Sequence, residues 1–203
     1  MNKFLLMFCF CVAGFGAKAQ AFAEKNLQQA VLQFNTSKTV NDYDAFYKKF
    51  STANASERWQ AYYYQSAAMF LKTDQLAKKV PAESLREPNA LAGKAALGAF
   101  TSQRDNAEMN ILIGLVSLQS IQLNFCPDVQ KELTAIAKNI ATAESISPNN
   151  PRLAILKARI AERSGDKAEA EKQYQKALNE FTKYNSSDSS IPNWGRQLLP
   201  TNN

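Results

Sequence analysis

Apolar residues recur at intervals of three and four positions along most of this chain, and this spacing predicts helices. Polar or proline-containing stretches separate the apolar stripes and predict loops; the least regular of these, 74–89, is expected to hold a short helix and an irregular connection. The helices are expected at 21–34, 40–53, 56–70, 90–100, 107–125, 129–145, 151–164 and 167–181. The chain is therefore predicted to be all-α, with about seven or eight helices stacked as antiparallel hairpins.

The segment 107–125 differs from the other predicted helices because its apolar residues cover nearly the whole circumference. A helix that is apolar all round has to be buried on all sides. This segment is therefore expected to be the centre of the domain.

The clearest local signals lie between Ser147 and Phe181. Pro151 can open a helix because the first-turn N–H groups have no intrahelical partner. Gly165 suits a left-handed helix end, and Asp166 is a good N-cap for a second helix. Two helices joined by so short a turn pack antiparallel.

This hairpin resembles the tetratricopeptide repeat family. Small residues stand where the family needs close helix contact, the Gly-Asp pair falls at its turn, and a proline falls between repeats; the matching positions are Pro148, Ala158, Gly165, Asp166, Ala170, Tyr174 and Ala177. The best-defined repeat covers 148–181, close to the 34-residue period of the family. The segments ERWQAYYYQSA, SPNNPRL and IPNWG also resemble exported, largely uncharacterised tetratricopeptide-like proteins of Gram-negative bacteria. The resemblance implies a TPR-like α-solenoid.

The resemblance also implies where a partner would bind. The first helices of successive hairpins line the groove in this family, and the corresponding positions here are Arg152, Ile155, Arg159, Glu162 and Arg163. Three arginines on one helix face suit a carboxylate, such as a peptide C-terminus or an acidic segment. In the alternative interpretation, these arginines pair with Glu162 and nearby acids of the chain itself.

The N-terminus has the features of a secretory signal peptide. Lys3 precedes an apolar stretch at 4–15, and Ala17-Lys18-Ala19 is a small-x-small cleavage site. Cleavage after Ala19 would leave a mature chain that is periplasmic or secreted and has no transmembrane segment. The domain organisation is thus predicted as a signal peptide at 1–19, a TPR-like helical domain at 20–184, and a polar linker with a C-terminal cap or tail at 185–203.

Composition narrows the possible chemistry. The net charge of +6 comes from basic residues that alternate with acidic ones, which favours a solvated surface over a nucleic-acid footprint. The chain has no histidine, and after signal cleavage Cys126 would be its only cysteine, expected as a buried, inert thiol or, in the alternative, as a reactive or intermolecularly paired one. No nucleotide-binding or nucleophile-elbow motif occurs. We therefore predict a protein without catalytic residues, cofactor or metal.

Two functions from different classes remain. The first is a non-enzymatic protein-interaction module that presents a helical surface to a protein or peptide partner. The second is a carrier of a small or lipid-like ligand, in which aromatic residues of the 56–70 helix would line a pocket: Trp59, Tyr62, Tyr63 and Tyr64. Aromatic residues at helical spacing more often fill a core. Trp194 and Leu198, beyond the polar linker, are expected either to fold back as a cap on the last hairpin or to form a short docking peptide.

Overall fold

The computed structural model describes residues 21–183 and 188–200, so the predicted signal peptide at 1–19 lies outside the described residues. The described part is all-α, with eight α-helices, three short 3-10 helices and no strand. The α-helices are α1 (Lys25–Thr36), α2 (Val40–Phe50), α3 (Arg58–Leu76), α4 (Arg86–Phe100), α5 (Ala107–Gln122), α6 (Val129–Ile146), α7 (Pro151–Ser164) and α8 (Lys167–Phe181). The 3-10 helices are η1 (Ala55–Glu57), η2 (Ala82–Leu85) and η3 (Arg196–Leu198). The predicted all-α class and the predicted number of about seven or eight helices are confirmed.

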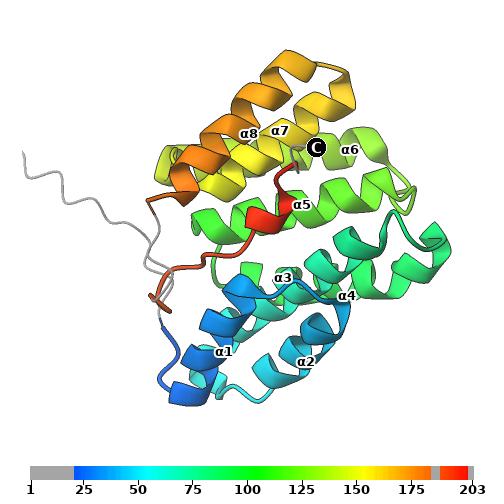
Figure 1. The fold of residues 1–203 in the computed structure, drawn as a ribbon. Helices are drawn as coiled ribbons and strands as arrows, with labels where there is room; N and C mark the ends of the chain where they lie inside the picture. The colour runs from blue at the N-terminus through cyan, green and yellow to red at the C-terminus, as the bar shows by residue number, and fades with distance from the viewer. Residues whose placement is uncertain (1–20, 184–187, 201–203) are drawn as a thin grey trace, which may run out of the picture.

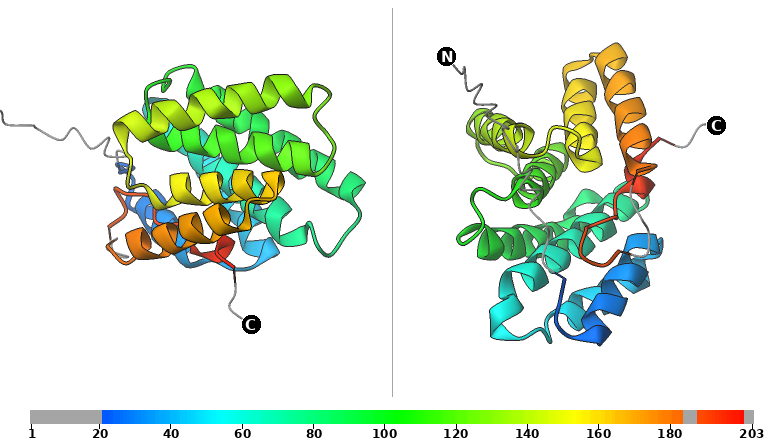
Figure 2. Two further views of the ribbon diagram at one scale, coloured as in Figure 1. Left: turned by 90° about the horizontal axis from the view of Figure 1, so that it is seen from above. Right: turned by 90° about the vertical axis from the view of Figure 1, so that its left-hand side faces the viewer.

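The helices follow one another through the molecule, from α1 and α2 at one end to α7 and α8 at the other (Figure 1). Neighbours in sequence pack as hairpins, and α5 also contacts α3 and α7. Figure 2 shows the chain returning after α8, so that its last described residues lie beside the N-terminal helices. This return brings together segments that are far apart in the sequence.

Helix α5 occupies the centre of the core, as its apolar circumference predicts. Its buried positions lie on all sides, and they include Met109, Leu112, Leu115 and Leu118. It packs against α3, α4, α6 and α7. The core therefore forms one continuous cluster from α1 to the C-terminal segment.

The region 74–89 differs most from the predicted helix limits. Helix α3 extends to Leu76, and α4 begins at Arg86 rather than at residue 90. Pro88 does not prevent this start because it stands in the first turn of α4, where its missing N–H breaks no helical hydrogen bond. The short helix expected in this region is η2.

The aromatic residues of α3 mainly fill the core. Tyr63 and Tyr64 are buried, and the Tyr64 ring stacks on Phe50 with 4.9 Å between centroids. Trp59 and Tyr62 are half-buried and pack against the same core. The core interpretation is thus correct for Tyr63 and Tyr64, which line no open aromatic pocket.

None of the described helices is both long and apolar enough to cross a membrane.

Candidate functional site

Helix α7 carries the five residues that the sequence assigns to partner binding. Pro151 stands at the first helical position, as predicted, and the Asn150 side chain caps the helix by accepting a hydrogen bond from the Arg152 N–H. Gly165 ends the helix with a φ of 83°, in the left-handed region. The Asp166 side chain then caps α8 by accepting a hydrogen bond from the Glu169 N–H.

The structure divides these five residues into two groups. Arg152 and Ile155 have no exposed surface, Arg159 is half-buried, and Glu162 and Arg163 are exposed. The prediction of a partner-contacting surface is therefore wrong for Arg152 and Ile155, because both belong to the interior of the domain. The other three residues remain accessible.

Arg152 forms a buried ion pair with Glu108 of α5. Its Nη2 lies 2.6 Å from Glu108 Oε1, and its Nε donates to Glu108 Oε2 at 2.9 Å. Its third contact runs to the C-terminal segment, where Nη1 donates to the main-chain oxygen of Trp194 at 3.0 Å. One guanidinium group thus joins α7, α5 and the returning end of the chain.

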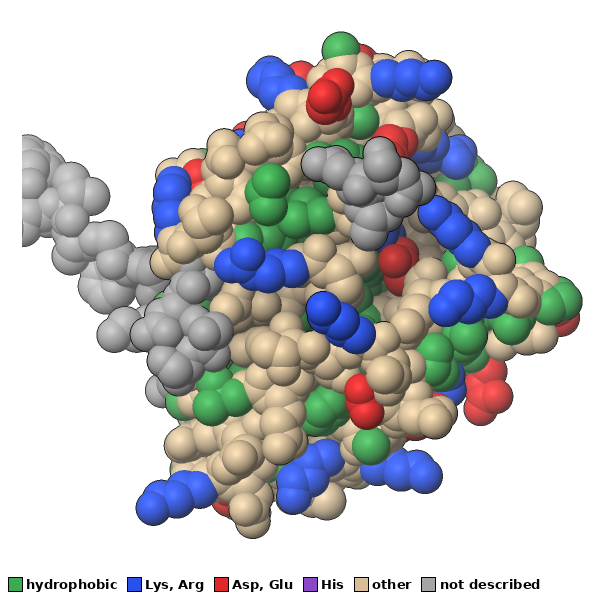
Figure 3. Space-filling model, in the orientation of Figure 1, with side chains coloured by type: hydrophobic (Ala, Val, Ile, Leu, Met, Phe, Trp, Pro, Cys, Tyr) green, Lys and Arg blue, Asp and Glu red, His purple; other side chains and the backbone are tan. Residues whose placement is uncertain are grey.

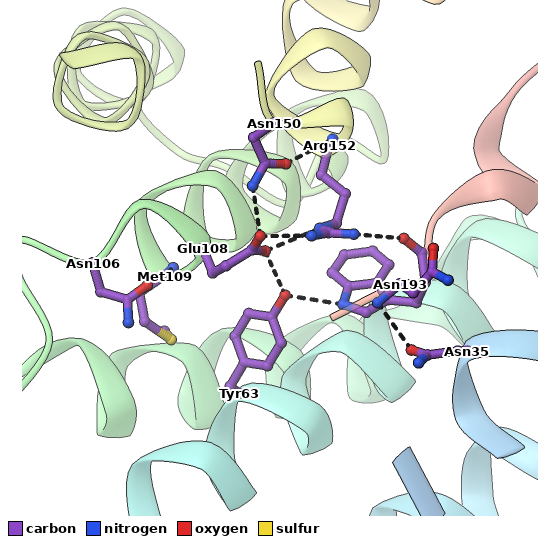
Figure 4. Close-up of polar contacts among 9 residues, drawn as sticks. Asn35, Tyr63, Asn106, Glu108, Met109, Asn150, Arg152 and Asn193 are labelled. Carbon is purple, nitrogen blue, oxygen red and sulfur yellow. Dashed lines mark hydrogen bonds and ion pairs between the residues drawn. The ribbon is translucent and has the colours of Figure 1, made fainter. Parts of the chain in front are cut away.

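Three further side chains complete this cluster, which Figure 4 shows in close-up. The Tyr63 hydroxyl donates to Glu108 Oε2 at 2.7 Å, and Asn150 Nδ2 donates to Glu108 Oε1 at 2.5 Å. Trp194 Nε1 donates to the Tyr63 hydroxyl at 3.0 Å. We call Tyr63, Glu108, Asn150, Arg152 and Trp194 the buried polar network.

Electrostatics keep Glu108 ionised. Burial alone would raise the pKa of Glu108, but the Arg152 charge and the hydrogen bonds from Arg152, Tyr63 and Asn150 outweigh it and lower the pKa. Burial, together with the Glu108 charge, raises the pKa of Tyr63 well above its ordinary value. Both oxygens of Glu108 are already occupied by donors, so the network is suited to joining helices rather than to proton transfer.

The accessible part of α7 borders an open groove. Two adjoining hollows of about 620 and 580 Å³ share Glu162, Tyr174, Leu199 and Pro200. Arg159 lines one of them and Leu178 lines the other. We call this combined hollow, between α7, α8 and the end of the C-terminal segment, the α7–α8 groove. Figure 3 shows basic and acidic side chains interspersed on this face of the molecule.

Ion pairs and hydrogen bonds already hold the polar side chains of this groove. Arg159 Nη1 lies 2.6 Å from Asp74 Oδ1 of α3, and the Tyr174 hydroxyl donates to Glu162 Oε2 at 3.0 Å. Burial, followed by the Glu162 charge, raises the pKa of Tyr174. The alternative in which the arginines pair with acids of the chain therefore describes Arg152 and Arg159, although their partners are Glu108 and Asp74 rather than Glu162.

The α7–α8 groove carries no excess of either charge. Its acidic residues are Asp74, Glu162 and Glu171, and its basic residues are Lys78, Arg159 and Lys167. Tyr174, Leu178 and Leu199 supply aromatic and aliphatic surface between them, and Leu178 is 43% exposed. Such a lining matches a segment of mixed composition better than a strongly acidic one.

The remaining candidate for reactivity, Cys126, lies apart from the buried polar network and from the α7–α8 groove. Cys126 is a free, half-buried cysteine beside α4 and α5, where Leu97 and Val116 line a different hollow. Among the described residues, no group of three or more His, Cys, Asp and Glu side chains is placed to hold a metal ion.

Comparison with known proteins adds no functional residue. No family model matches the chain, and no curated protein or solved structure is significantly similar to it.

Proposed function

We propose that this protein is an exported, non-enzymatic interaction protein that binds a segment of a partner protein in the α7–α8 groove. The observation that carries the proposal is the groove itself, which is open and of ligand-binding size and combines apolar surface with a few polar groups. It includes two residues that the repeat resemblance assigns to partner binding, Arg159 and Glu162.

The composition of the groove sets the kind of partner. Arg152 and Arg159 already pair with carboxylates, so only Arg163 of the three arginines has an exposed guanidinium for an acidic ligand. Contact with Tyr174, Leu178 and Leu199 would then supply most of the affinity, because apolar burial is the main favourable term in association. We therefore expect binding that depends only weakly on salt, unlike capture of an acidic segment by arginines.

Substitution at Leu178 tests this proposal. A Leu178→Asp variant places a charge in the groove, in the hollow that Tyr174 and Leu199 also line, without removing a core side chain, because the leucine is 43% exposed and lies outside the core cluster. Affinity capture with the mature protein from the envelope fraction of its host should recover a partner with the wild type, in both low and high salt. The variant should bind the purified partner at least about tenfold more weakly, the loss expected when apolar contact is replaced by a buried charge.

Leu97→Asp is the matched control. Leu97 is an exposed leucine of α4, it is 62% exposed, and it lines the separate hollow beside Cys126. Capture should be unchanged in this variant. Equal capture by the wild type and Leu178→Asp, or a loss confined to Leu97→Asp, would remove the α7–α8 groove as the binding surface.

A further inference from the structure

The last described segment, 188–200, is bound to the helices in the manner of a peptide ligand. Except for η3 it has no regular secondary structure, yet residues 192–195 are buried and Trp194 has no exposed surface. A stretch without regular structure must have its buried main-chain groups paired by other means. Side chains of the helical domain provide that pairing.

Two of these side chains bind the main chain of the segment. Arg152 Nη1 donates to the Trp194 carbonyl oxygen, and Asn35 Oδ1 of α1 accepts a hydrogen bond from the Asn193 N–H at 3.1 Å. Helix α7 thus supplies the donor and helix α1 supplies the acceptor, from opposite ends of the domain. Figure 4 shows both contacts converging on this short stretch.

The Trp194 side chain provides the anchor. Its ring lies against Phe34 and Phe70, with centroids 6.5 and 6.3 Å away, and its Nε1 donates to Tyr63. The guanidinium of Arg152 lies over the same ring, 5.5 Å from the centroid. We call Asn35, Phe34, Tyr63, Phe70 and Arg152 the tryptophan seat.

The polarity of the tryptophan seat is unusual for a permanent core. A buried Arg–Glu pair is seldom more stable than apolar residues of the same volume, because both charges lose their hydration. A polar seat has an advantage when the segment leaves, because water can then hydrate Arg152 and Tyr63 of the seat and the neighbouring Glu108. An all-apolar seat would instead expose an apolar patch that promotes aggregation. Its chemistry therefore suits a segment that can detach.

We propose that the tryptophan seat is a peptide-binding site, filled in the monomer by residues 191–195 and able to accept the same segment from a second copy of the chain. The second copy is the appropriate occupant because it carries the matching sequence, a tryptophan preceded by Pro-Asn and followed by glycine. Exchange of an identical element between copies needs no new surface. This inference does not rest on partner binding in the α7–α8 groove, although Leu199 and Pro200 of the same segment line that groove.

A labelled peptide with the sequence of residues 189–200 tests the site in the full-length mature protein. In the wild type the attached segment competes at a high effective concentration, so the peptide should bind weakly. Trp194→Ala removes the anchor of the attached segment and leaves the seat intact, so the peptide should bind at least about tenfold more tightly than to the wild type. The same peptide with alanine in place of tryptophan should not bind.

Gly195→Ala is a second variant that removes no core side chain. Gly195 has a φ of 108°, and an added Cβ would lie 3.2 Å from Arg152 Cγ and 3.3 Å from Phe181 Cζ. The substitution should therefore loosen the attached segment and increase binding of the unmodified peptide. If this variant has the wild-type circular dichroism spectrum and binds no more peptide than the wild type, the proposal is overturned, whether or not Trp194→Ala folds.

Light scattering tests whether a second copy of the chain can fill the tryptophan seat. Wild-type protein that is unfolded and then refolded at high concentration should contain dimers, and Trp194→Ala treated in the same way should contain far fewer. Peptide binding by the variants without any wild-type dimer would overturn the exchange between copies.

Discussion

Arg152 and Arg159 lie two turns apart on the same face of α7, yet they stand in different surroundings. Arg152 is fully buried between Glu108 and Trp194, whereas Arg159 borders an open groove and pairs with Asp74. The repeat resemblance assigns both to one binding face. The C-terminal segment explains the difference at Arg152, because it covers the start of α7 with Trp194. Part of the face expected for a partner is therefore occupied by the chain itself.

Among the substitutions that test this contrast, Arg152→Ala should cause the largest loss in the free energy of unfolding. The variant leaves Glu108 buried without its cation, and removing one partner of a buried ion pair costs about 3–5 kcal/mol. We expect a loss of that size in the free energy of unfolding, measured by urea denaturation.

Arg163→Ala is the control, because Arg163 is an exposed arginine of the same helix. Its effect should stay within about 0.5 kcal/mol, as for most surface substitutions. Similar losses for Arg152→Ala and Arg163→Ala would contradict the buried pair.

Acid should weaken the buried polar network. The folded-state pKa of Glu108 lies below its ordinary value of 4.5, so the unfolded chain takes up the proton more readily than the folded one. The contribution of this group is therefore complete above about pH 4.5 and is lost as the pH falls below that value through the folded-state pKa. Melting temperatures of the wild type measured from pH 6 to pH 3 should fall accordingly.

The Glu108→Gln variant distinguishes the effect of Glu108 titration from that of the other carboxylates. The variant should be less stable than the wild type at pH 6, and the difference between the two should shrink as the pH falls. A constant difference over the whole range would show that Glu108 does not titrate in this way.

A smaller effect than at Arg152 is expected at the groove. The side chains of Arg159 and Asp74 are 12% and 27% exposed, against 0% and 11% for Arg152 and Glu108, so water reaches this ion pair more readily. Arg159→Ala should therefore lower the free energy of unfolding by about 1–3 kcal/mol, the cost of leaving one partner of a largely buried hydrogen bond unsatisfied. Part of this loss should disappear in 1 M salt, which can be followed by urea denaturation in two buffers. A loss as large as that of Arg152→Ala would mean that the two ends of α7 do not differ.

Local signals were sufficient to predict the helices and the last hairpin. Proline, asparagine, aspartate and glycine act within one turn of their own positions, and Pro151, Gly165 and Asp166 have the predicted roles. The helix limits differ from the prediction between residues 74 and 89, where prolines indicate an irregular connection although Pro88 stands in the first turn of α4.

The buried polar network could not be assembled from the sequence because its members are far apart in the chain. Tyr63 and Trp194 are 131 residues apart, and Arg152 and Glu108 are 44 apart. One signal was present: Glu108 is the only charged residue of a helix with buried positions on all sides, and a buried carboxylate requires a partner. Which of the 24 Lys and Arg residues supplies that partner depends on the tertiary fold.

The separation in sequence between Phe34 and Trp194 has a consequence for the order of folding. Trp194 packs against Phe34, 160 positions earlier, so the core of the first three helices is completed by a residue that follows the eighth helix. Contacts between residues so far apart form late, since the entropy of closing the intervening loop must be overcome first. During synthesis, the helices α1 to α3 would thus lack this contact until the residues beyond α8 have been made.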